Sequence, residues 1–152
     1  MDLDGVNWEA LNRLRELFLR GDGGGADYWR SESDLASYDA TFGRRIAWKW
    51  DFVLGELDRL CWRPAGGVLV DFGCGSGVAA RRVLDHFGAG AFSRIVLCDR
   101  SPLAMRFAAA RVRDCLAATP GPPAQAGAPA ARLETTPAAD LANATALLSH
   151  VL

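Results

Sequence analysis

The chain has 152 residues, half of them hydrophobic, and a formal net charge of −1. This length suits a single domain and is short for a complete enzyme built from many strand–helix units, while the composition excludes a disordered chain. The near-neutral charge gives no support to an extended basic surface for nucleic acid, and no apolar run approaches the roughly 20 residues that cross a bilayer.

The N-terminal part is predicted to be helical. An amphipathic helix is expected over residues 8–19, followed by a glycine-rich loop over 21–25. A second helix should begin near Ser33, a good capping residue, and Gly43 should interrupt it. In the longer helix that follows, five apolar residues predict a continuous stripe facing the core: Ile46, Trp50, Val53, Leu57 and Leu60.

Aromatic residues are concentrated in this part, since ten of the fourteen lie before residue 63. They either pack the helices on a sheet, which we favour, or form a surface on which RNA bases stack. The stretch most typical of a lid over a cofactor contains Tyr28, Trp29, Ser33 and Tyr38. The nearby Arg44 and Arg45 either meet a phosphate group or remain solvated.

Strands and helices alternate after Pro64 and the two glycines that follow it. The β-branched run Val68–Val70 suits a buried parallel strand, and a helix is expected over residues 76–87. A second strand is expected over 94–98 and a second helix over 101–118. Ser101 is a good cap for that helix, and Pro102 occupies its first position, where proline is tolerated.

The remaining residues predict a connector and two more strands. Residues 119–131, rich in proline, glycine and alanine, should form an irregular surface loop, followed by strands over 132–135 and 144–152. The predicted fold class is α/β with a Rossmann-like parallel sheet: residues 66–152 form this domain, and residues 1–65 form a helical segment packed on it. Because the chain stops at a strand with an apolar edge, we expect a truncated, incomplete domain.

The cysteines predict the redox state and location of the protein. Cys61, Cys74, Cys98 and Cys115 are widely spaced, and none belongs to a CxxC pair. No leader with a charged start and an apolar centre precedes them. We therefore expect reduced thiols in a soluble, cytoplasmic protein.

Three glycines, Gly73, Gly75 and Gly77, occupy the predicted turn between the first strand and the next helix. Without side chains they let the backbone approach a ligand closely, so this turn is the candidate cofactor cradle, with Cys74 as a small residue inside it. The glycines alone do not identify the cofactor, because Gly75, Gly77 and Ala80 also fit the GxGxxA fingerprint of NAD-binding proteins.

Asp71, two residues before Gly73, distinguishes between the two cofactors. A pyrophosphate favours positive potential at this turn, and a carboxylate opposes it, whereas a cationic ligand reverses the preference. S-adenosylmethionine carries a sulfonium and an α-ammonium, so Asp71 favours S-adenosylmethionine over NAD. Asp99 ends the second strand 22 residues after Gly77, close to the separation of about 20 expected for an acid that accepts ribose hydroxyls.

The run VLVDFGCGSG, followed by IVLCDRSPLAMRFAAAR, resembles the first two motifs of class I S-adenosylmethionine-dependent methyltransferases. The resemblance covers residues 68–113. It implies that the loop from Asp71 to Gly77 contacts the methionine portion and Asp99 the ribose, with Arg100 and Ser101 lining the adenosine. After the third strand, where that family usually has a residue that binds the adenine amino group, this chain has Pro137, with Asp140 as the nearest substitute.

A narrower resemblance comes from SESDLASYDATFGRRIAWKW and the final LLSHVL, which are similar to the ribosomal small-subunit-associated methyltransferase-like family. It implies a methyl acceptor linked to the small ribosomal subunit or its RNA. The metal-cluster cysteines of that family's later half have no counterpart here, so no metal is expected. No catalytic residue is assigned, because methyl transfer from a sulfonium requires no obligatory acid or base. A non-catalytic assembly or binding module with the same fold is the alternative function.

Overall fold

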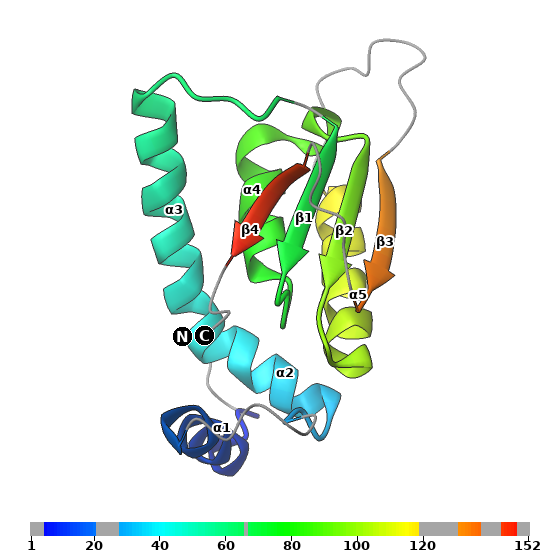
Figure 1. The fold of residues 1–152 in the computed structure, drawn as a ribbon. Helices are drawn as coiled ribbons and strands as arrows, with labels where there is room; N and C mark the ends of the chain where they lie inside the picture. Colours follow the sequence, from blue (N-terminus) through cyan, green and yellow to red (C-terminus); the bar gives the residue numbers. More distant parts are fainter. Residues whose placement is uncertain (1–4, 21–27, 66, 119–130, 138–143, 149–152) are drawn as a thin grey trace.

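A computed structural model describes residues 5–20, 28–65, 67–118, 131–137 and 144–148. Its centre is a four-stranded parallel sheet with the order β3-β2-β1-β4 (Figure 1). The strands are β1 (Val68–Phe72), β2 (Arg94–Cys98), β3 (Arg132–Thr136) and β4 (Ala144–Leu148). The predicted α/β class with a Rossmann-like parallel sheet is therefore confirmed. The predicted loop over 21–25, nearly all of that over 119–131, Asp140 and residues 149–152 lie outside the described residues.

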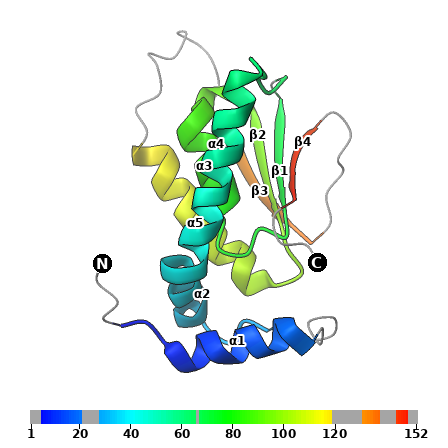
Figure 2. The same ribbon diagram turned by 90° about the vertical axis from the view of Figure 1, so that its left-hand side faces the viewer.

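Two crossover helices join the first three strands. They are α4 (Val78–Phe87) between β1 and β2, and α5 (Pro102–Ala118), which follows β2. Both lie on the same face of the sheet, and α3 (Arg44–Arg59) packs outside α4 on that side (Figure 2). The core between these layers is formed by fully buried aliphatic side chains, among them Leu69, Leu84, Ile95, Leu97 and Val112.

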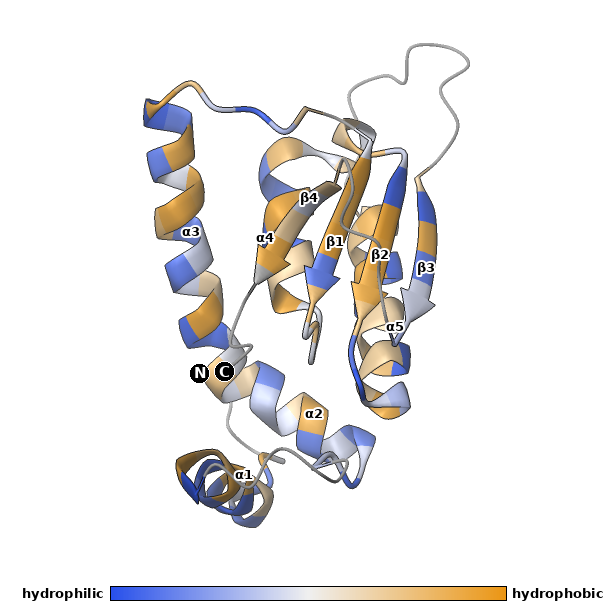
Figure 3. Ribbon diagram, viewed as in Figure 1, coloured by the Kyte–Doolittle hydropathy of each residue, from blue (hydrophilic) through white to orange (hydrophobic). Residues whose placement is uncertain are grey.

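Hydropathy follows this layering. The inner strands β1 and β2 are mostly hydrophobic, whereas the edge strand β3 carries more polar residues (Figure 3). The inner strands lie between two neighbouring strands and are mostly buried, while the edge strand β3 tolerates polar side chains because water reaches it. Among the described residues, no helix is both long enough and apolar enough to cross a membrane. The four cysteines, all in the described part, are free thiols.

The N-terminal helices form a second, smaller core against the start of α5. Helix α1 (Trp8–Arg20) and helix α2 (Glu32–Tyr38) bury Leu11, Leu14 and Leu35 against Trp29 and Ala104. An ion pair between Arg13 and the buried Asp34 joins α1 to α2.

The start of α2 and its link to α3 differ from the prediction. Ser31, not Ser33, caps α2, because its hydroxyl accepts the Asp34 N–H at 3.2 Å. Gly43 does not interrupt the helix: a π-helical turn over Asp39–Gly43 joins α2 directly to α3. A Cβ at Gly43 would lie 3.1 Å from Asp39 Oδ1. Glycine is therefore favoured here for the space it leaves for a carboxylate.

The predicted stripe on α3 is partly wrong. Ile46 is buried, but Val53 is 44% exposed and Leu60, at the end of the helix, is 76% exposed. Leu54 is buried instead of Val53, with Trp50 and Leu57 partly buried beside it. The buried stripe is narrow because α3 packs along a single helix, α4, and exposes its remaining faces. Helix α4 begins at Val78, two residues later than predicted.

Candidate functional site

The glycine loop lies at the carboxyl ends of the parallel strands, beside β1. The chain continues from β1 to β2 on one side of β1, and β4 pairs on the other side, so the strand order reverses at this position. Ligands of open parallel sheets bind at such a reversal. Gly73 and Cys74 donate their N–H groups to the Cys98 carbonyl, at 2.8 and 3.0 Å, and this ties the loop to the end of β2.

The three glycines have different roles. All have left-handed backbone conformations, with φ of 72° at Gly73, 51° at Gly75 and 75° at Gly77. A Cβ on Gly77 would lie only 3.0 Å from Ala108 Cβ, so this glycine permits the close packing of α4 on α5. Gly75 has no such neighbour, since a Cβ there would meet only the Gly73 carbonyl oxygen at 3.9 Å. Gly73 and Gly75 therefore remain the glycines at which a ligand could approach the backbone, and both line the cavity described below.

Asp71 is the most unusual residue of the site. Its side chain is fully buried, and its neighbours in register are Leu97 on β2 and Leu147 on β4. Oδ2 accepts the Ala80 N–H at 3.1 Å, but Oδ1 has no hydrogen-bond partner among the described residues. Burial raises the pKa of Asp71 to about 7, and the charge of Asp99 adds to this rise although the Ala80 N–H opposes it. The site thus has a buried acceptor atom that a cationic donor would stabilise.

The second predicted acid, Asp99, holds the site together through its backbone contacts. Oδ2 accepts the Gly75 N–H and Oδ1 accepts the Ser101 N–H, both at 2.9 Å. Each carboxylate oxygen keeps a lone pair after accepting one bond, so Asp99 retains capacity for two further donors. Ser101 caps α5 by accepting the Ala104 N–H, and the Arg100 guanidinium lies 5.1 Å from the centroid of the Tyr28 ring.

A cavity of about 490 Å³ lies above the loop. One wall contains four of the predicted residues: Asp71, Gly73, Cys74 and Gly75. The opposite wall contains a row of rings from the N-terminal segment: Tyr28, Trp29, Tyr38 and Phe42. Successive centroids in this row are 4.9, 5.2 and 5.6 Å apart. The four other predicted residues, Gly77, Asp99, Arg100 and Ser101, lie behind or beside the loop and do not line this cavity in the described part of the chain.

The structure also brings residues to the site that the sequence did not single out. Arg15 and Lys49 line the same cavity, whereas Ser33 of the expected lid stretch does not. Asp39 connects the lid to the loop, because its Oδ1 accepts the Ser76 hydroxyl at 2.9 Å and pairs with Arg81 of α4. No motif in the sequence marks these residues. Phe42, Arg45 and Lys49 recur only at helical spacing, which predicts a shared helix face but no function.

Two titratable side chains in the cavity wall, Cys74 and Tyr38, do not provide a nucleophile or a base at neutral pH. Burial raises the pKa of the Cys74 thiol far above its usual range, so Cys74 stays protonated. Burial likewise raises the pKa of Tyr38 to about 12. Asp71 differs from both, because its pKa of about 7 lies near neutrality.

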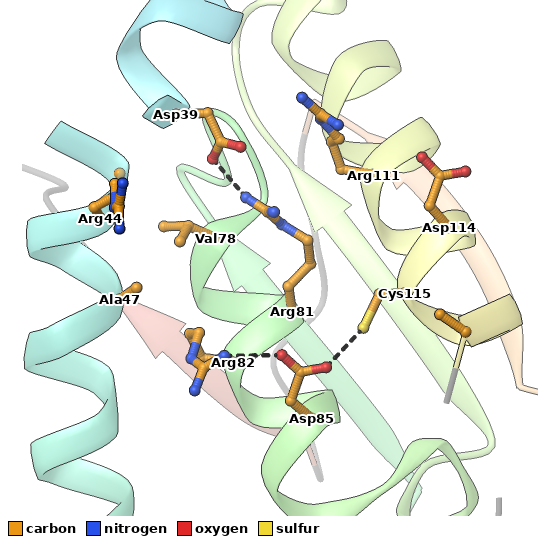
Figure 4. A pocket seen from close by; sticks show the side chains of 12 residues that line it. Asp39, Arg44, Ala47, Val78, Arg81, Arg82, Asp85, Arg111, Asp114 and Cys115 are labelled. Atoms are coloured by element: carbon orange, nitrogen blue, oxygen red, sulfur yellow. Dashed lines mark hydrogen bonds and ion pairs between the residues drawn. The ribbon is translucent and has the colours of Figure 1, made fainter. Parts of the chain in front are cut away.

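A second cavity, of about 620 Å³, lies between α3, α4 and α5 on the helical side (Figure 4). Its charged side chains are largely paired with one another: Asp39 with Arg81, and Asp85 with Arg82. The Cys115 thiol donates to Asp85. Because these opposite charges neutralise one another, this cavity is a weaker candidate than the one above the glycine loop.

Comparison with protein-family models, with curated proteins and with solved structures finds no match to this chain. Within the described ranges, no group of three or more histidine, cysteine, aspartate or glutamate side chains is arranged to hold a metal ion.

Proposed function

We propose that this chain is an S-adenosylmethionine-dependent methyltransferase whose methyl donor binds in the cavity above the glycine loop. The observation that carries the proposal is the buried, unpartnered Oδ1 of Asp71 beside Gly73 and Gly75. A buried anionic acceptor at this position favours a cationic ligand and disfavours a dinucleotide pyrophosphate. The α-ammonium of the donor is the group that we expect near Asp71.

The other residues of the site fit the rest of the donor. Asp99 does not line the cavity, but it accepts a bond from Gly75 in the cavity wall and retains lone pairs, so we expect the two ribose hydroxyls on that side of the loop. When bound, the donor supplies an electrophilic methyl group: the acceptor's lone pair bonds to that carbon, the carbon–sulfur bond breaks, its electrons stay on sulfur, and any displaced proton leaves to solvent. The chain's residues align the reactants and exclude water, and the aromatic wall suits the second task.

For the methyl acceptor, the proposal names only a class of molecule. The resemblance to the ribosomal small-subunit-associated methyltransferase-like family favours an acceptor linked to the small ribosomal subunit or its RNA. Transfer from a sulfonium does not require a general base, so the proposal gives no residue that role. We therefore assign the chain a role in donor binding and alignment.

Calorimetry with S-adenosylhomocysteine tests the proposal. Near pH 7 about half of the Asp71 side chains carry a proton, and a bound ammonium group lowers the pKa of Asp71. Binding should therefore release a proton from Asp71, and the measured heat should differ between two buffers with different ionisation enthalpies. The release should be absent in Asp71→Asn, and binding should weaken at least about tenfold.

Two controls make the result specific. Asp114→Asn removes an exposed carboxylate of α5 that does not line this cavity, and it should leave both binding and proton release unchanged. NAD should produce no binding heat. Binding of NAD with S-adenosylhomocysteine inactive, or equal binding of S-adenosylhomocysteine by the Asp71→Asn protein, would contradict the proposal.

A further inference from the structure

A groove of about 410 Å³ lies between α1 and the segment that joins α2 to α3. Three of the residues that line it are aromatic: Trp8, Phe42 and Trp48. The two tryptophans are unusually open for such large apolar side chains, since Trp8 is 54% and Trp48 is 70% exposed. A single exposed apolar ring is ordinary on a protein surface. Several exposed rings in one groove mark an interaction surface, because a partner that covers them removes apolar area from water.

The charge of the groove is one-sided. Arg15, Arg44 and Arg45 line it, and no aspartate or glutamate does so among the described residues. In the same part of the chain, neither Arg15 nor Arg44 forms an ion pair, whereas Arg45 lies over the Phe42 ring at 5.9 Å. Glu16, next to Arg15 in the sequence, pairs with Arg20, and Asp39, five residues before Arg44, is engaged by Arg81 and Ser76. The groove therefore presents positive charge that its own acids do not neutralise, although the whole chain is slightly acidic.

The groove adjoins the proposed donor cavity. Arg15, Phe42 and Arg45 line both of them. The groove and the donor cavity therefore share part of a wall, so a ligand in the groove lies next to the donor cavity. This continuity separates the groove from the other exposed apolar side chains of α3, such as Phe52, which line neither cavity.

We propose that this groove binds single-stranded nucleic acid, with bases stacked on the tryptophans and phosphates held by the arginines. Stacking on exposed rings within a positively charged groove is the arrangement that suits unpaired bases, whose faces are free. An acidic peptide would match the charge but would leave the flat faces of Trp8 and Trp48 without a planar partner. Binding of the strand does not depend on the proposed function. Presentation of one of its bases to the methyl donor does rest on the proposed function.

Fluorescence anisotropy tests the binding. The probe is a fluorescein-labelled RNA of mixed sequence, about 12 nucleotides long, with the DNA of the same sequence and the RNA duplex as further probes. Both single strands should bind the full chain, and the duplex should bind at least tenfold more weakly. Three arginine–phosphate contacts predict a slope of about −2 when the logarithm of the association constant is plotted against that of the salt concentration.

Variants locate the strand on the protein. Trp48→Ala should weaken single-strand binding about 5- to 100-fold, and Arg44→Ala should lower the slope in salt by about 0.7. Phe52→Ala and Arg113→Ala change equally exposed residues outside the groove and should change neither quantity. Each variant alters a surface side chain, so circular dichroism should confirm unchanged folding.

Several outcomes would overturn the inference: no oligonucleotide binding, equal binding by Trp48→Ala and the unchanged protein, or displacement of the probe by polyglutamate at equal charge concentration. S-adenosylhomocysteine binding by Trp48→Ala is measured separately and should be unchanged, because Trp48 does not line the donor cavity. Loss of donor binding with intact strand binding would contradict the proposed function alone. The reverse result would contradict the groove alone.

Discussion

Replacing Asp71 by asparagine should remove the decrease in stability that titration of Asp71 causes as the pH rises. The substitution keeps the size of the side chain and an oxygen for the Ala80 N–H, but it removes the charge from a fully buried position. The pKa of Asp71 is about 7 in the folded chain, against 3.8 for an ordinary aspartate. Between these values the folded protein holds a proton that the unfolded chain has lost. The contribution of Asp71 to stability is therefore greatest below pH 3.8, falls as the pH rises, and levels off above about pH 7.

The size of the effect follows from that window. Between about pH 5 and the folded pKa of about 7 there are two units, and each unit corresponds to about 1.4 kcal/mol. The free energy of unfolding of Asp71→Asn should therefore rise by about 3 kcal/mol relative to the unchanged protein when the pH increases from about 5 to about 8. Urea denaturation at several pH values, followed by circular dichroism, measures this difference directly.

The variant and the unchanged protein are compared at the same pH, so the titration of other groups cancels from the difference in their free energies of unfolding. The control Asp114→Asn removes an exposed carboxylate. Its free energy of unfolding should differ from that of the unchanged protein by less than about 0.5 kcal/mol at every pH. A constant difference between Asp71→Asn and the unchanged protein from about pH 5 to about pH 8 would refute the reasoning. It would mean that Asp71 is either hydrated or already paired in the folded chain.

Three other substitutions test the frame of the site by urea denaturation. Gly77→Ala should lower the free energy of unfolding by about 2 kcal/mol more than Gly67→Ala. Both glycines have positive φ, but only at Gly77 would a Cβ come within 3.0 Å of a neighbouring helix. Equal losses of stability in the two variants would contradict this. Asp39→Asn should cost about 1–3 kcal/mol by weakening its bonds to Ser76 and α4, whereas the exposed Asp51→Asn should cost less than about 0.5 kcal/mol. Ser101→Ala should cost about 1 kcal/mol through loss of the α5 cap, and an unchanged midpoint would exclude that role.

The sheet and its crossover helices could be predicted because their signals are local. Short apolar runs mark β1 and β2, and the first and last residues of β2 agree with the prediction. Ser101 and Pro102 mark the start of α5 for stereochemical reasons that do not depend on the rest of the fold. The acids at the ends of two strands could also be found, since parallel strands bring their carboxyl ends to one edge.

The aromatic stretch with Tyr28, Trp29 and Tyr38 was predicted, but its link to the glycine loop and the groove beside it could not be, because both depend on contacts between distant residues. Gly43 appeared to be a helix breaker, yet in the structure it is helical and leaves room for the Asp39 carboxylate. That carboxylate reaches Ser76, 37 residues away. No periodicity in the N-terminal segment encodes this contact. Within α3, helical spacing alone allows either Val53 or Leu54 to follow Trp50 on the stripe, and only the packing on α4 selects Leu54.

The boundary between residues 65 and 66 divides the sequence by pattern, but it does not divide the site. The glycine loop supplies one wall of the donor cavity, and Tyr38 and Phe42 supply the facing wall from the N-terminal segment. Phe42 also lines the arginine-rich groove, so a single side chain belongs to both surfaces. Because Asp39, three residues earlier, is bonded to Ser76 beside the loop, a displacement of the N-terminal helices would change both the cavity and the groove. Donor binding and strand binding should therefore be energetically coupled through the Asp39–Gly43 turn.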